Sequence, residues 1–317
     1  MKNTGRFHGQ GRSIQDQQGE VPAGGSMTTP TPPGLHGQPA PVGGRTLTAQ
    51  DIEEDHSYRS QYLRHLTGKL SRPTTAVPAA PIPRVLVQFW DDSAHIPTDV
   101  QECMTSWTAL EDQGFRREIY DDGSARKLIH FLFGEAHIAA FDACSHPAMR
   151  SDYFRLCYLA RNGGFYVDAD DVYQGTDWTL LFRDSRLRLQ ALCYDTATDT
   201  MVDPRQAMMA DGYCSTFVHY VNNNPIIAPA EHPVVVAALQ SATDALLAHT
   251  GGPLDVQSLT GPGNLTVALA RHALHRERFG QSVDVEVLLA WDIIAVSRWP
   301  LSYRNDQRNW RLWRQQQ

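Results

Sequence analysis

The chain has 317 residues, of which 42% are hydrophobic, and it carries a net charge of −7 at pH 7. A chain of this size and composition can bury a sizeable core, and its acidic balance excludes the broad basic surface that binding to nucleic acid or anionic lipid requires. Its five cysteines have neither Cys-x-x-Cys nor Cys/His ligand spacing, which argues against a zinc site and against a disulfide framework.

The chain before residue 82 is predicted to contribute no catalytic residues. Residues 1–48 are rich in Gly, Pro, Gln, Ser and Thr and are predicted to be a disordered tail, because they hold few large apolar residues. Residues 49–81 are predicted to form a short helix, with Tyr62 and Leu66 at helical spacing, and a Pro/Ala linker.

No apolar run reaches the roughly 20 residues that span a bilayer, and no secretory signal is recognisable. We therefore expect a cytoplasmic protein, with secretion as an effector as the alternative.

Residues 82–317 alternate between strand and helix patterns. Apolar and β-branched runs predict strands at 85–90, 116–120, 165–167, 187–194, 226–229 and 285–289. Helical spacing predicts helices at 98–111, 124–133, 135–142, 147–161, 233–249 and 264–277. Strands that alternate with helices indicate an α/β fold with a mainly parallel central sheet covered on both faces.

An apolar helix with two charged side chains precedes the third predicted strand. Asp152 and Arg155 are three residues apart, so they project from the same side of this helix. Charged groups on a mostly buried helix require a partner or a ligand. Gly163 can adopt the left-handed conformation that ends the helix before the strand begins.

Two aspartates follow that strand directly. Asp168 and Asp170 come at its carboxyl end, which is where ligands bind in open α/β sheets. Neighbouring carboxylates repel each other, and a divalent cation removes this cost; oxygen ligands suit Mg²⁺ or Mn²⁺ rather than zinc. Such an ion would stabilise a departing diphosphate. The alternative is a solvated acidic turn, since aspartate is a favoured turn residue. The helix, double glycine and strand before the aspartates favour the metal site.

The same segment resembles a known family. The strings Ser151-Asp-Tyr-Phe-Arg155 and Gly163-Gly-Phe-Tyr-Val-Asp-Ala-Asp170 are similar to the signature of the DXD-containing sugar-binding region of family 32 glycosyltransferases. That family includes yeast initiation mannosyltransferase-like and bacterial capsular enzymes, and a similar pattern occurs in the large clostridial glucosylating toxins. Weaker similarities lie at 82–90, 223–233 and 260–263.

The resemblance implies a GT-A type, Rossmann-like domain over residues 82–317 that binds a nucleotide sugar. It implies a metal-dependent hexosyltransferase that uses Mn²⁺ or Mg²⁺ and a UDP- or GDP-hexose and acts with retention, for example in polysaccharide biosynthesis. The acceptor would be a hydroxyl of a glycan, a small molecule or a protein. Neither a nucleic-acid partner nor a transmembrane segment is expected.

The resemblance also implies a set of site residues. Asp170 would bind the metal directly, and Asp168 would face the ribose, the sugar or a metal-bound water. Asp152 and Arg155 would hold sugar hydroxyls and phosphate, which completes the catalytic set. Trp90 would lie near the base, where stacking contributes about 1–3 kcal/mol per base. The residues assigned to the donor are Trp90, Gln88, Asp152, Arg155, Asp168, Asn224 and Trp299.

The chain departs from the family in two places. Asp171 adds a third carboxylate where many relatives have an apolar or small residue, and the C-terminal His-His-Trp-type ending of the yeast-like members is absent. The toxins use a C-terminal loop to complete the metal and phosphate site. Asp292, Ser297 and Trp299 are therefore candidates for the same role here.

Two other functions stay open at the level of sequence. Asp168-Ala-Asp-Asp-Val172 also fits the first motif of haloacid-dehalogenase-like phosphatases, which would use Asp168 and Asp170. That mechanism usually needs a downstream lysine, and no lysine follows Lys127. The second alternative is a non-catalytic protein that binds sugar nucleotides.

Overall fold

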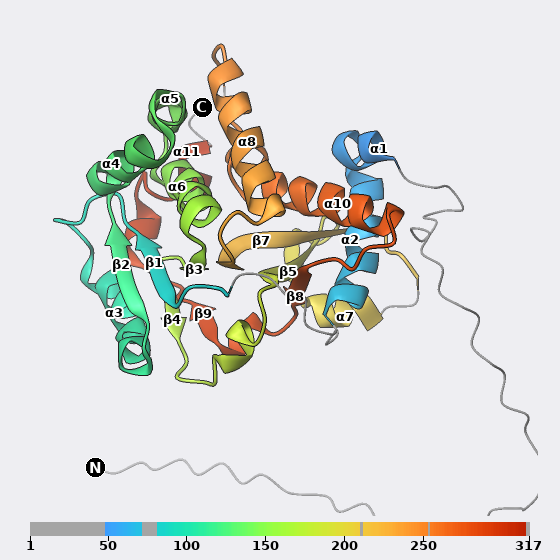
Figure 1. Cartoon of the computed structure of the whole chain (residues 1–317), viewed down its shortest axis with the longest axis horizontal. Coiled ribbons are helices and arrows are strands. Elements are labelled where there is room, and N and C mark those ends of the chain that lie inside the picture. The colour runs from blue at the N-terminus through green and yellow to red at the C-terminus, as the bar shows by residue number, and fades with distance from the viewer. Residues whose placement is uncertain (1–47, 72–80, 210–211, 253, 315–317) are drawn as a thin grey trace, which may run out of the picture. The chain divides into compact units, whose positions relative to one another are not determined.

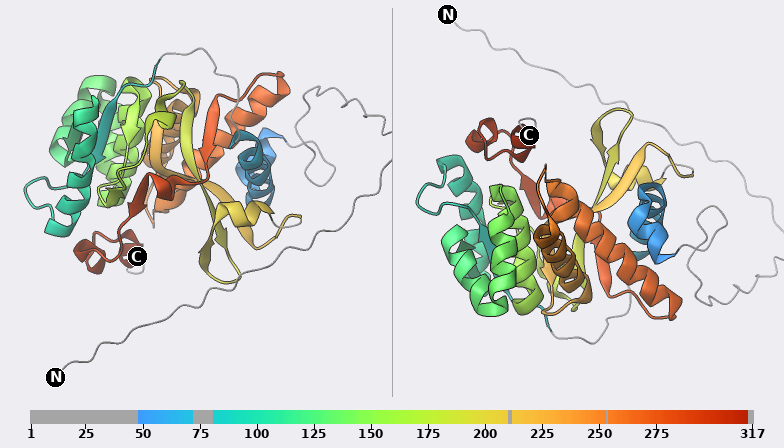
Figure 2. Two further views of the ribbon diagram at one scale, coloured as in Figure 1. Left: turned by 90° about the horizontal axis from the view of Figure 1, so that it is seen from below. Right: turned by 90° about the horizontal axis from the view of Figure 1, so that it is seen from above.

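The structure, a computed structural model, describes residues 48–71, 81–209, 212–252 and 254–314 (Figures 1 and 2). The predicted tail up to residue 47 and the linker at 72–80 lie outside the described residues. All described residues fall within one compact unit.

A seven-stranded sheet forms the centre of the fold (Figure 1). Its strands lie in the order β2-β1-β3-β7-β5-β6, with β8 paired to β5. β1, β2, β3, β5 and β8 run in one direction, whereas β6 and β7 run in the other. The predicted α/β fold with a mainly parallel central sheet is therefore confirmed. The strand bounds are β1 Val85–Phe89, β2 Arg116–Tyr120, β3 Gly164–Tyr166, β5 Leu187–Asp195, β6 Thr200–Val202, β7 Phe217–Ala228 and β8 Val285–Leu288.

A separate two-stranded sheet joins the aspartate segment to the C-terminal part of the chain. β4 (Asp171–Tyr173) pairs in antiparallel fashion with β9 (Ala295–Ser297), so that Asp171 lies opposite Ser297. Neither strand was predicted from the sequence, because three residues are too few to show an alternation of apolar and polar side chains. This pairing brings residues more than a hundred positions downstream to the predicted metal site.

Helices cover the main sheet. Figure 1 shows α4, α5, α6, α8 and α10 on one face, and α3 with the short 3-10 helix η1 packs at the other. Their bounds and those of the remaining helices are α3 Thr98–Ser106, η1 Trp107–Gln113, α4 Asp122–Phe133, α5 Glu135–Ala143, α6 Pro147–Asn162, η2 Thr179–Phe182, α7 Pro204–Met209, α8 Pro233–Ala248, α9 Val256–Leu259, α10 Pro262–Arg278, η3 Trp291–Ile293, η4 Ser302–Asn305 and α11 Trp310–Arg314.

Successive side chains on a strand point to opposite faces of the sheet, so the strands contribute residues to two apolar clusters. Val87 of β1 and Tyr166 of β3 belong to the larger cluster, together with residues of α6, α8 and α10. Their neighbours Leu86 and Phe165 belong to a second cluster with Trp107. Burial on both faces explains why these strands are continuous apolar runs in the sequence.

The short helix predicted within residues 49–81 is two helices, α1 (Ala49–Glu54) and α2 (His56–Leu70). Asp55 separates them with an extended backbone, and its side chain accepts from the N–H groups that open α2. Both helices are packed into the domain: Tyr62 and Leu66 are fully buried in the larger cluster. Ser60 Oγ donates to the carbonyl of Phe217 on β7 at 2.9 Å. The predicted boundary at 82 thus does not separate this segment from the folded unit.

The double glycine between α6 and β3 is required by close packing. Gly163 has φ 63° and ψ −170°, so its φ is positive as predicted, although its ψ is outside the left-handed helical region. A Cβ at Gly163 would lie 2.5 Å from the backbone nitrogen of Ala230, and one at Gly164 would lie 3.0 Å from the carbonyl oxygen of Val85. The chain therefore turns from α6 into β3 within a space that only glycine fits.

Two further expectations concern thiols and membrane spans. The cysteines are free thiols, as expected, and four of them are buried: Cys103, Cys144, Cys157 and Cys193. Within the described parts of the chain, no helix combines the length and apolar character needed to cross a membrane.

Candidate active site

A cavity of about 550 Å³ lies where β1 and β3 end, which is a typical volume for a small-ligand site. Residues of α6, β5 and β7 and the chain from Trp291 to Arg311 complete its walls. The structure brings most of the predicted site residues to this one cavity. They are Trp90, Asp152, Arg155, Asp168, Asp170, Asn224 and Trp299.

Arg155 connects the two predicted carboxylate positions. It is 3% exposed, and its Nη2 lies 3.0 Å from Asp152 Oδ1 and 2.8 Å from Asp168 Oδ1. Its Nη1 donates to the carbonyl of Asn223 at 2.7 Å, and its guanidinium lies 4.3 Å from the ring centre of Tyr166. The spacing of Asp152 and Arg155 on one helix face therefore produces a buried ion pair, and the second partner comes from the loop after β3.

The site holds more negative charge than Arg155 balances. Burial raises the pKa of Asp168 to about 6, and the neighbouring Asp170 and Asp152 add to this effect while Arg155 opposes it. Burial raises the pKa of Asp171 to about 8, again with help from Asp170 and Asp168. Crowded carboxylates with raised pKa values are stabilised by any cation that binds beside them.

Two amides on β7 position these carboxylates. Asn224 accepts from the N–H of Asp168 at 3.0 Å and donates to Asp171 Oδ2 at 2.9 Å. Asn223 donates to Asp152 Oδ1 at 2.8 Å. Both amides are buried, and in this structure their hydrogen bonds hold the loop after β3 and its acidic groups in place. The predicted contact of Asn224 with the donor stays a prediction.

Asp170 is bound by the C-terminal part of the chain. The hydroxyl of Tyr303 donates to Asp170 Oδ2 at 2.8 Å, and the guanidinium of Arg304 donates to the same oxygen. Arg304 in turn stacks on Trp299, with 3.3 Å between its Cζ and the ring centre. Tyr303 and Arg304 were not predicted from the sequence, because no spacing in the chain relates this hydroxyl and this guanidinium to Asp170.

The other candidates from the C-terminal region also line the cavity. Asp292, Ser297 and Trp299 all contribute to its wall, in the region where the resemblance implied a completing loop. Trp90 is 8% exposed and meets the ring of Tyr303 edge-on, with 5.2 Å between the ring centres. An aromatic wall of Trp90, Tyr303 and Trp299 therefore faces the aspartates.

Gln88 does not line the cavity. It is fully buried in β1, and neither atom of its amide has a hydrogen-bond partner among the described residues. The predicted contact of Gln88 with the donor would need a change in its surroundings, and it stays a prediction.

Two groups of acidic or histidine side chains are candidates for a metal site, and the first is the group of aspartates after β3. Asp168, Asp170 and Asp171 do not form a closed three-ligand cluster in the described part of the chain. Mg²⁺ and Mn²⁺ sites of phosphate-transfer enzymes nevertheless use one or two carboxylates, with substrate phosphates and waters as the other ligands. One oxygen of Asp171, Oδ1, is buried without a hydrogen-bond partner. An oxygen-rich loop with an unsatisfied carboxylate atom fits a hard divalent cation.

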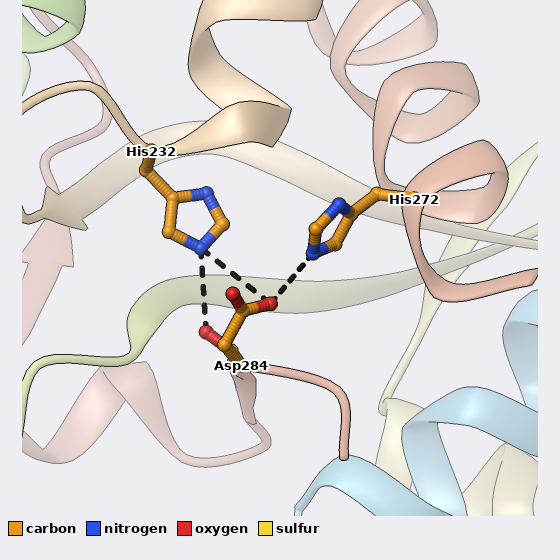
Figure 3. Close-up of side chains that lie close together, drawn as sticks. All are labelled: His232, His272 and Asp284. Carbon is orange, nitrogen blue, oxygen red and sulfur yellow. Dashed lines mark hydrogen bonds and ion pairs between the residues drawn. The ribbon is translucent and has the colours of Figure 1, made fainter. Parts of the chain in front are cut away.

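The second group is His232, His272 and Asp284, whose ligand atoms all lie within 4.8 Å of one another (Figure 3). Its hydrogen bonds argue against a metal. His232 Nδ1 accepts from the N–H of Val234 as the cap of α8, so Nε2 carries the proton and faces Asp284. Asp284 Oδ1 also lies 2.6 Å from His272 Nε2. This group therefore connects the start of α8, the middle of α10 and the loop before β8.

The His232 group gives a prediction about acid stability. Burial lowers the pKa of His232 to about 4, although Asp284 opposes this; His272 and Arg276 are the other charged groups that face it. Between pH 6.5 and 4 the unfolded chain binds a proton at this position that the folded chain does not, so stability falls as the pH falls. The loss amounts to about 3 kcal/mol at most. Urea unfolding at pH 7 and pH 5 measures it.

The matched variant is His232→Asn, because asparagine keeps the cap and does not titrate. This variant should lose less stability between pH 7 and pH 5 than the wild type. His65→Asn, at an exposed position in α2, should keep the wild-type difference. Equal pH dependence in the wild type and His232→Asn would contradict the assignment.

Comparison with known protein families finds a match for part of the chain. Residues 97–181 match the family described as "glycosyltransferase sugar-binding region containing DXD motif", and the matched range contains Asp168-Ala-Asp170. The match supports a glycosyltransferase, and both aspartates of the matched motif, Asp168 and Asp170, line the cavity. More particularly, residues 97–181 belong to the DXD-containing sugar-binding family, as the resemblance predicted.

Comparisons with individual proteins include a solved structure of low sequence identity. A solved structure described as "PaToxG Glycosyltransferase" is similar over 84% of this chain and 96% of that chain, with 16% identity and a TM-score of 0.40. No curated protein matches the chain.

Proposed function

We propose that the chain transfers a hexose from UDP or GDP to an acceptor hydroxyl, with a divalent metal ion and net retention at the sugar carbon, on a GT-A type fold. The observation that carries the proposal is the position of Asp168 and Asp170, which lie within the matched residues 97–181, follow β3 directly and line the cavity at the ends of β1 and β3. A solvated acidic turn would not be enclosed by Arg155, Asn224 and Arg304.

The proposed division of the cavity follows the chemistry of its walls. Asp170, with Asp168 beside it, would hold Mn²⁺ or Mg²⁺. The ion would neutralise the charge of the departing diphosphate. Asp152 and Arg155 form a rigid, buried pair that would orient sugar hydroxyls, because Asn223 and Thr260 already fix the carboxylate. Trp90 would provide an aromatic surface for the base. No side chain is assigned as a nucleophile, and retention rests on the family resemblance.

A donor screen tests this function. The purified protein is incubated with UDP- and GDP-hexoses and Mn²⁺, Mg²⁺ or EDTA, and the released nucleoside diphosphate is measured. Slow hydrolysis of one donor without acceptor, lost in EDTA, is the expected result. NMR of the first product that forms shows whether its anomeric configuration is that of the donor.

The alternatives predict other outcomes in the same screen. A phosphatase would hydrolyse p-nitrophenyl phosphate and leave nucleotide sugars intact. A non-catalytic binding protein would show a calorimetric binding signal with a nucleotide sugar and Mn²⁺ but release no nucleotide. Either result would overturn the proposed transfer reaction.

A further inference from the structure

Arg304 occupies the position where the proposed function requires a cation. Its guanidinium donates to Asp170 Oδ2, the carboxylate assigned to the metal, and the hydroxyl of Tyr303 donates to the same oxygen. The side chains of Arg304 and Asp170 are only 13% and 12% exposed. An added divalent ion at this oxygen would lie beside a guanidinium, and the two positive charges would repel each other.

The backbone of residues 301–309 is anchored by contacts that do not involve the side chain of Asp170. Leu301 is 2% exposed and belongs to an apolar cluster with Trp90 and Met104. The N–H and hydroxyl of Ser302 donate to Asp99 at 2.6 and 2.9 Å. Asn309 donates to the carbonyl of Arg304 at 2.7 Å. Arg304 can therefore change its partner by a movement of its side chain while the backbone around it stays in place.

Arg304 also has unused donors. A guanidinium has five N–H groups, and Arg304 Nε is buried without a hydrogen-bond partner among the described residues. Two other arginines of the cavity are more fully engaged: Arg155 binds two aspartates, and Arg308 binds both oxygens of Asp306. Arginine is suited to bidentate binding of phosphate oxygens. Arg304 is therefore better placed than Arg155 and Arg308 to receive a diphosphate.

We propose that Arg304 exchanges partners: it neutralises Asp170 in the empty site and binds the donor's diphosphate once a metal ion takes its place on Asp170. This inference rests on the proposed function, because it takes the diphosphate of a nucleotide sugar as the second partner. Metal and nucleotide then bind cooperatively. The metal releases Arg304 from Asp170 so that it can bind the diphosphate, and the diphosphate draws Arg304 away from the metal position. The coupling is therefore reciprocal.

The test measures binding of Mn²⁺ alone, by calorimetry or electron paramagnetic resonance, to the wild type and to Arg304→Gln. Removing the competing guanidinium should raise the affinity for Mn²⁺ on the order of tenfold, a typical size for such coupling. With saturating Mn²⁺, the same variant should bind UDP or GDP, whichever the donor screen selects, on the order of tenfold more weakly. The opposite signs of the two effects are the signature of partner exchange.

Two further variants separate charge from folding. Arg304→Lys keeps the positive charge and should bind Mn²⁺ alone as the wild type does. Arg298→Gln is the matched control, because Arg298 lies on the same segment but pairs with Glu102, 2.7 Å away. It should change neither affinity. Thermal melts of all four proteins verify that the C-terminal segment stays folded.

Unchanged or weaker binding of Mn²⁺ by Arg304→Gln, or the absence of Mn²⁺ binding in both proteins, would overturn the exchange. Its failure is distinguishable from failure of the proposed function. Donor turnover without an effect of Arg304→Gln on Mn²⁺ would leave the transferase and reject the exchange. The two opposite binding effects without any donor turnover would support the exchange and reject the transfer reaction.

Discussion

Replacing Asp170 with asparagine is expected to lower the rate of metal-dependent donor turnover by about 10²–10³-fold, the usual cost of losing one preorganised electrostatic contact. The substitution removes the negative charge that would hold the metal and keeps nearly the same shape. An asparagine oxygen can still accept from Tyr303, so the C-terminal segment should stay in place. Release of UDP or GDP at saturating donor and Mn²⁺ measures the effect.

The matched control is Asp177→Asn. Asp177 is exposed, its carboxylate accepts from Thr179, and it does not line the cavity. The same chemical change at this position should leave the rate within about twofold of the wild type, as expected of a surface substitution. Full activity of Asp170→Asn in the presence of Mn²⁺ would remove Asp170 from the metal site.

Replacing Arg155 with glutamine is expected to destabilise the fold by about 3–5 kcal/mol, because it leaves the buried carboxylate of Asp152 without its cation. Asp152 is 7% exposed, and it shares Arg155 Nη2 with Asp168. The loss should appear as a lower urea midpoint at pH 7. Donor turnover should fall as well, because the carboxylates proposed to face the sugar lose their alignment.

Arg161→Gln is the control on the same helix. Arg161 is 51% exposed and pairs across the surface with Glu231, so its loss should cost less than about 1 kcal/mol. The double variant Arg155→Gln, Asp152→Asn should recover part of the lost stability, since it also removes one uncompensated charge. Equal urea midpoints for Arg155→Gln and Arg161→Gln would mean that the buried pair does not stabilise the fold.

The sequence was sufficient to predict the local features that repeat along the chain. Strands such as β1 and helices such as α6 were found because their apolar runs are long and their ends are marked by glycine or aspartate. The position of Asp152 and Arg155 on one side of the helix followed from helical spacing alone, and in the structure the two side chains form an ion pair. The aspartates after β3 were found because the strand, the turn and the acidic groups are contiguous.

Contacts between distant segments could not be predicted in this way. Asn224 reaches Asp171 because β7 lies beside β3, and nothing in the spacing of these residues shows it. Arg304 reaches Asp170 through the short pairing of β4 with β9. The packing of α2 was missed for a similar reason: a linker follows it in sequence, and its buried face meets strands more than 150 residues downstream.

That docking of α2 has a practical consequence for anyone who shortens the gene. Ser60 bridges the carbonyl of Phe217 and the N–H of His219, at 2.9 Å each, on the same strand that delivers Asn223 and Asn224 to the carboxylates. A truncated protein that starts at residue 97, where the family match begins, would lack α2. The face of β7 that α2 covers would then be exposed to water, and the carbonyl of Phe217 and the N–H of His219 would lose their hydrogen-bond partner. The family match therefore covers a shorter range than the smallest fragment expected to fold, which must also include α2.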